Sequence, residues 1–92
     1  MDAATRQRWH DHRPALELAL GAMAAELDGG PQMRAAGLAA LERLRSSWWS
    51  CSADREALLE LRGLSGNDLP GALVVRAAIE VIEGWATELE GG

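Results

Sequence analysis

The stretch GALVVRAAIEVIEGWATELE, residues 71–90, carries the strongest pattern in the chain and decides the fold class. Its apolar residues recur three or four positions apart, the spacing of one helix face, at Val75, Ala78, Ile82, Trp85 and Leu89. Polar residues recur in the same way on the opposite face, at Arg76, Glu80, Glu83, Thr87 and Glu90. The stretch therefore predicts a long amphipathic helix that buries one side.

Proline and glycine divide the rest of the chain into further predicted helices, at about residues 2–12, 14–27, 31–49 and 53–62. Asp2 is a suitable N-cap for the first of them. Pro14 and Pro31 suit the first turns of the second and third, because proline is tolerated only at the start of a helix.

The ends of the two remaining helices are also expected from local signals. Ser52 is predicted to cap the fourth helix, which would end near Arg62 with Gly63 as a left-handed C-cap. Asn67 or Asp68 is predicted to cap the last helix.

The second and third helices each carry one apolar stripe. In the second helix the stripe consists of Leu16, Leu20, Met23 and Leu27. In the third helix it consists of Gly37, Leu41, Leu44 and Trp48. Helices of this kind are stable only when their stripes pack against one another, which favours a bundle.

Composition gives the same fold class. Ala and Leu account for 31 of the 92 residues, whereas Val, Ile and Thr together account for 7. This excess of helix formers excludes a β-sandwich, a barrel and a doubly wound α/β domain. We predict an all-α fold, a single compact bundle of four to five short helices, orthogonal or up-and-down, with residues 1–92 forming one domain.

The formal charge of −5 is uneven along the chain. Residues 1–49 hold six Arg and six acidic residues, whereas residues 50–92 hold three Arg and eight acidic residues. The acidic excess is therefore expected on the last two helices. All nine basic residues are Arg, a bias typical of high-GC bacteria and their phages.

The sequence also bears on location. No uncharged stretch approaches the roughly 18 residues that a membrane helix needs, so no membrane span is expected. The single cysteine, Cys51, cannot form an intramolecular disulfide, and a cytoplasmic location is expected.

The sequence contains few residues that could support catalysis or bind a metal or cofactor. Cys51 is the one candidate nucleophile, at the predicted start of a helix, and only His10 or His12 could serve it as a base. The spacing brings neither histidine to Cys51, and it provides no metal-ligand set and no phosphate-binding loop. We therefore expect no enzyme, no metal and no cofactor.

Nucleic-acid binding is also not expected. Basic residues occur near the N-terminus and in the third helix, at Arg6, Arg8, Arg13, Arg34, Arg43 and Arg45. The helix that would have to read the groove, residues 53–62, carries Asp54, Glu56 and Glu60, and the whole chain is acidic.

Tryptophan and acidic residues are the candidate partner-binding residues. The chain has four Trp with no Phe and no Tyr, and Trp is enriched at binding hot spots. Trp48 and Trp85 fall on predicted apolar stripes, whereas Trp9 and Trp49 are expected either to pack within the chain or to face a partner. Glu80, Glu83 and Glu88 could form part of an acidic surface for a basic partner, or a solvated helix face.

Two functions are consistent with these features. The first is a small, non-enzymatic protein–protein interaction module, adaptor or regulatory, which could also form a homodimer. The second is a phage-type anti-defence inhibitor whose acidic second half blocks a basic nucleic-acid-binding site on its target protein.

Overall fold

The computed structural model describes residues 1–27, 30–64 and 71–91. Its helices are α1 (Ala3–Asp11), α2 (Arg13–Glu26), α3 (Pro31–Trp49), α4 (Arg55–Leu64) and α5 (Ala72–Gly91). No residue in the described ranges is in a strand, so the predicted all-α class is confirmed.

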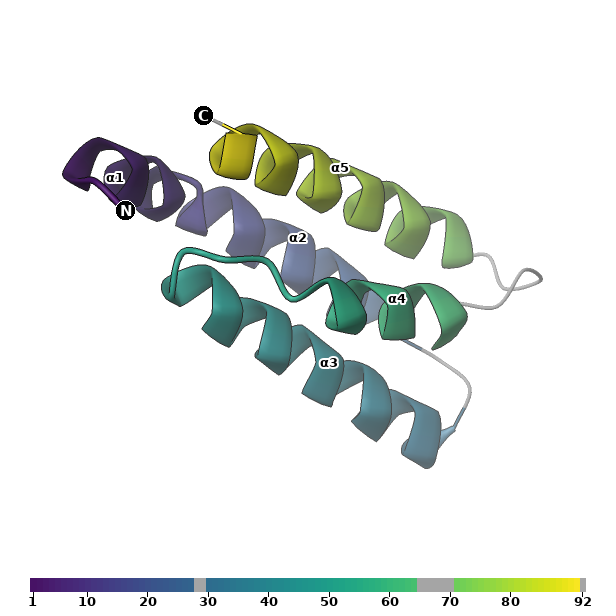
Figure 1. Cartoon of the computed structure of the whole chain (residues 1–92). Coiled ribbons are helices and arrows are strands. Elements are labelled where there is room, and N and C mark those ends of the chain that lie inside the picture. The colour runs from purple at the N-terminus through teal and green to yellow at the C-terminus, as the bar shows by residue number, and fades with distance from the viewer. Residues whose placement is uncertain (28–29, 65–70, 92) are drawn as a thin grey trace.

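Figure 1 shows how the helices are arranged around one long axis. α1 leads into α2 through His12, and α3, α4 and α5 run alongside. α2 and α4 occupy opposite sides of the bundle, each between α3 and α5, so the neighbouring pairs are α2 with α3, α3 with α4, α4 with α5 and α5 with α2. The result is an up-and-down bundle with extents of 42 × 20 × 20 Å.

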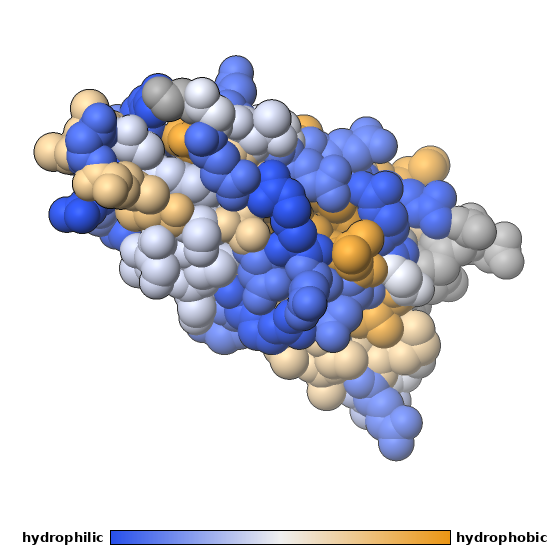
Figure 2. All heavy atoms as spheres, in the orientation of Figure 1, coloured by the Kyte–Doolittle hydropathy of each residue, from blue (hydrophilic) through white to orange (hydrophobic). Residues whose placement is uncertain are grey.

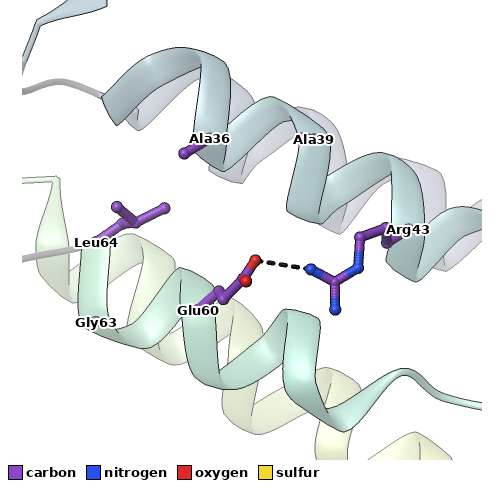
Figure 3. Close-up of a pocket in the computed structure, with 6 residues that line it drawn as sticks. All are labelled: Ala36, Ala39, Arg43, Glu60, Gly63 and Leu64. Atoms are coloured by element: carbon purple, nitrogen blue, oxygen red, sulfur yellow. Dashed lines mark hydrogen bonds and ion pairs between the residues drawn. The ribbon is translucent and has the colours of Figure 1, made fainter. Parts of the chain in front are cut away.

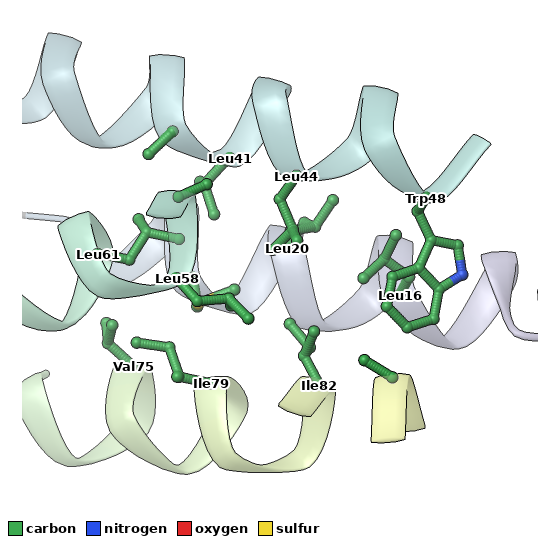
Figure 4. Close-up of a cluster of buried hydrophobic side chains, with 14 of the residues drawn as sticks. Leu16, Leu20, Leu41, Leu44, Trp48, Leu58, Leu61, Val75, Ile79 and Ile82 are labelled. Carbon is green, nitrogen blue, oxygen red and sulfur yellow. The ribbon is translucent and has the colours of Figure 1, made fainter. Parts of the chain in front are cut away.

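The core lies along the axis of this bundle (Figure 4), and the predicted stripes of α2 and α3 point into it. All four apolar residues of the predicted α2 stripe are buried, as are Leu41, Leu44 and Trp48 of α3. Gly37 lets the Leu27 side chain at the end of α2 pack closely against α3. A Cβ at this position would lie 2.8 Å from the Leu27 methyl carbons.

The predicted inward stripe of α5 is only partly right. Val75, Ile82 and Leu89 are buried as expected, but Ala78 and Trp85 are half-buried, and Ile79 and Ala86 take the central positions. The cause is that α5 carries apolar residues on a second face as well. These residues moved the predicted stripe away from the face that is buried.

The predicted cap of α1 is confirmed. The backbone N–H of Thr5 donates to the Asp2 carboxylate at 2.7 Å. The same hydrogen bond holds the pKa of Asp2 below its usual value.

The predicted bounds of α4 are wrong at both ends. The N-cap is Asp54 instead of Ser52, because the carboxylate of Asp54 accepts a 3.0 Å hydrogen bond from the N–H of Ala57. Ser52 donates instead to the Ser47 carbonyl. The helix also continues through Gly63 to Leu64. The predicted cap of the last helix, Asn67 or Asp68, lies outside the described residues.

α3 ends in a Schellman motif. The N–H of Ser52 donates to the Ser47 carbonyl at 3.0 Å, and the N–H of Cys51 donates to the Trp48 carbonyl at 2.9 Å. Cys51 occupies the left-handed position with φ of 60°, where glycine is the usual residue. The chain is thereby turned back toward α4.

We predict that Cys51→Gly is more stable than Cys51→Ala by about 1 kcal/mol, because both lose the thiol but only glycine avoids the left-handed strain. Urea unfolding followed by circular dichroism measures the difference. Equal midpoints for the two variants would contradict a strained Cys51.

Candidate interaction surfaces

Trp9 lies in the core and is removed from the candidate partner surface. Its side chain is 1% exposed, and its ring meets that of Trp48 edge to face with centroids 4.7 Å apart. Neither indole N–H donates a hydrogen bond within the described chain, so ring contact and burial hold the pair. The sequence could not show this, because Trp9 belongs to a helix of otherwise polar pattern.

Trp49 lies at the surface at the end of α3, with 41% of its side chain exposed. The guanidinium of Arg13 covers one ring face, 4.6 Å from the centroid, and donates to the Trp49 carbonyl at 3.2 Å. Trp49 thus remains a candidate for partner contact, although Arg13 already covers one face of its ring.

We predict that Trp9→Ala lowers the free energy of unfolding by about 3 kcal/mol or more, because it leaves a cavity beside Trp48. Trp49→Ala should cost less than about 1 kcal/mol, since it removes a surface contact. Chemical denaturation of both variants tests this. A larger loss for Trp49→Ala would contradict the placement of the two rings.

Arginines neutralise much of the acidic second half. Arg43 of α3 lies 2.9 Å from Glu60, 3.4 Å from Asp54 and 3.9 Å from Glu56. The hydrogen bond to Glu60 raises the pKa of the Arg43 guanidinium above its usual value. The charge imbalance between the two halves of the sequence is therefore reduced by pairing across the α3–α4 seam.

The α5 acids fall into two groups. Glu83 pairs with Arg62 at 3.4 Å, and Glu90 pairs with Arg55 at 3.0 Å. Glu80 and Glu88 are exposed and form no ion pair with the described residues. The candidates Glu80, Glu83 and Glu88 therefore do not form one uniformly unpaired surface.

The α3–α4 seam contains an open groove that the sequence did not reveal. It encloses about 580 Å³ and is lined by Ala36, Ala39, Arg43, Glu60, Gly63 and Leu64. Figure 3 shows the two alanines on α3 facing Gly63 and Leu64 on α4, with the Arg43–Glu60 pair at one end. Its small lining residues come from two helices, so the groove could not be identified before the structure showed that α3 and α4 are neighbours.

The groove continues past Arg43. A second hollow of about 450 Å³ shares Ala39 and Arg43 with the first and adds Glu42, Ser46 and Asp54. We call the two together the α3–α4 groove. It has an apolar half near Gly63 and a charged half near Asp54.

In the described part of the chain, no hydrogen bond joins the candidate nucleophile Cys51 to a histidine. Cys51 follows the carboxyl end of α3 and precedes the first residue of α4 by four positions, so it is not at a helix N-terminus as predicted. His12 is engaged elsewhere, with its Nδ1 atom 3.0 Å from the Arg8 carbonyl oxygen and its ring against Trp85. The described residues contain no group of three or more His, Cys, Asp or Glu that could hold a metal ion.

The arginines of α3 do not form a free basic surface. Arg45 pairs with Glu17 of α2 at 2.7 Å and also with Glu42, while Arg43 is held by the α4 acids. Figure 2 shows hydrophilic residues across the middle of this face and apolar residues gathered toward its two ends. No helix in the described ranges is both long and apolar enough to cross a membrane.

The chain matches no protein-family model, no curated protein and no solved structure.

Proposed function

We propose that this chain is a small, non-enzymatic protein-interaction module that holds an amphipathic segment of another protein in the α3–α4 groove. The observation that carries the proposal is the open hollow of about 580 Å³ over the small side chains of Ala36, Ala39 and Gly63. Grooves between helices that expose small apolar residues suit the apolar face of a peptide helix.

The apolar half of the groove accounts for affinity. Ala36, Ala39 and Gly63 are exposed, and apart from the local backbone of α4 and the neighbours of Gly63, no atom lies within 4 Å of where a Cβ on Gly63 would be. A Leu- or Met-sized side chain can therefore approach the backbone of α4 closely and lose its contact with water there.

The charged half accounts for selectivity. Asp54, Glu56 and Glu60 lie around a single Arg43, so three carboxylates face one guanidinium and this end of the groove is negative overall. A basic residue flanking the apolar side chains of the partner would face these carboxylates. The partner segment is thus amphipathic and carries Arg or Lys at one end.

An acidic inhibitor of a nucleic-acid-binding protein is the second candidate. Glu80 and Glu88 of α5, which form no ion pair within the described residues, favour it. The ion pairs formed by Glu83 and Glu90 weaken it, because paired carboxylates attract a basic site less strongly. A cytoplasmic bacterial or phage setting suits both candidates, since a lone cysteine needs no oxidising compartment.

The test uses designed helical peptides of about 15 residues with one apolar stripe and either Lys or Glu beside it. We expect the Lys peptide to bind at least tenfold more tightly at low salt. Amide NMR shifts should concentrate on Ala36, Ala39, Gly63 and Leu64. Ala36→Phe, which fills the groove, should abolish binding, while Ala35→Phe on the same helix should not.

The Gln variants of Glu80, Glu83 and Glu88 separate the two candidates. Unchanged peptide binding in the triple variant is expected if the groove is the site. Equal effects of Ala36→Phe and Ala35→Phe, or shifts confined to α5, would overturn the groove proposal.

A further inference from the structure

The outer face of α2 is uncharged along its length. Its exposed residues before Glu26 are Pro14, Leu18, Gly21, Ala22 and Ala25. Leu18 is 78% exposed, an unusual position for a leucine near the middle of a helix. An amphipathic helix normally turns polar residues to this side, so this face is not explained by packing within the chain.

α5 extends the same apolar face. The two helices are antiparallel neighbours, because His12 before α2 meets Trp85, and Glu26 at the end of α2 lies against Gly71. This register places Val74, Ala78 and Val81 within one helical turn of Ala25, Ala22 and Leu18 along the α2–α5 seam. Val74 and Val81 are 43% and 47% exposed. We call these six residues the α2–α5 face.

The acidic residues of both helices other than Glu26 and Glu88 point to other seams. Glu17 pairs with Arg45 of α3, and Glu83 pairs with Arg62 of α4. Glu80 falls on the same side of α5 as Glu83, three residues earlier. The six residues of the α2–α5 face therefore carry no charge, and Glu26 and Glu88 lie at its two ends.

We propose that the α2–α5 face binds a second copy of this chain to form a two-fold symmetric dimer. The charge distribution selects this occupant. The other seams carry Glu17 and Glu42, Glu56 and Glu60, or Glu83 and Glu90, so an isologous contact through any of them would bring carboxylates together. The six residues of the α2–α5 face carry no charge, so two chains of charge −5 can meet through it with acidic residues only at its rim.

The dimensions agree with a dimer. The six residues would form the apolar centre of the interface, and residues around them on the same long side of the bundle, 42 Å in its longest extent, would complete the roughly 800 Å² per partner that a stable interface buries. Small residues such as Ala22 and Ala25 let two helices approach closely enough to exclude water.

The test is sedimentation equilibrium of the full chain at about 10 to 500 µM, with dimer formation expected at micromolar Kd or below. Leu18→Glu and Val81→Glu should each raise Kd about a hundredfold, because they place like charges across the two-fold axis. Leu59→Glu is the matched control: Leu59 is 65% exposed on α4, away from the face, and its variant should stay dimeric. Circular dichroism confirms that each variant is folded.

Salt gives an independent readout. Raising NaCl should leave the dimer unchanged or tighten it, because the remaining acidic charges repel and the interface holds no ion pair. A monomer at every concentration would overturn the proposal, as would a monomer that binds phosphatidylcholine vesicles instead. A dimer disrupted by Leu59→Glu but not by Leu18→Glu would also overturn it. None of the substituted residues lines the α3–α4 groove. The result of the peptide-binding test therefore does not depend on the result of the dimer test.

Discussion

The edge-to-face contact of Trp9 with Trp48 closes the end of the bundle that α4 does not reach. α4 has 10 residues, whereas α3 and α5 have 19 and 20. Figure 1 shows an irregular segment in place of helix along the rest of that side. Two indoles, each 1% exposed or less, fill the space that another helical turn would occupy. α1 therefore contributes to the core despite its polar pattern, because it places Trp9 against Trp48.

The C-terminal turn of α3 is linked to the contact between Trp9 and Trp48. Trp48 supplies the carbonyl that accepts from the N–H of Cys51, and Ser47 accepts from the backbone N–H of Asp54 at 3.0 Å through its hydroxyl. The turn that buries Trp48 thus also positions the residue that caps α4. Once α4 is placed there, Arg43 reaches the carboxylates of the next helix, and the groove beside it is formed.

The sequence was most informative where one local signal acts alone. Pro31 marks the first residue of α3, and the stripe from Leu16 to Leu27 is buried as predicted. Prediction failed where two signals compete. Apolar residues on both sides of α5 moved the expected stripe toward Ala78 and Trp85. Asp54, whose side chain belongs to the same capping class as that of Ser52, caps α4 in its place. Trp9 and the α3–α4 groove could not be predicted, since both depend on which helices become neighbours.

The two proposed surfaces lie on opposite seams of the bundle, one between α3 and α4 and the other between α2 and α5. A two-fold axis at the α2–α5 face would therefore direct both grooves outward, away from each other. Neither groove would be blocked by dimer formation, and a partner that presents two amphipathic segments could engage both. The second segment would then bind at a raised effective concentration, so a weak groove would suffice for a tight complex. A small module with shallow grooves gains from such an arrangement, because its own core leaves little room to deepen either one.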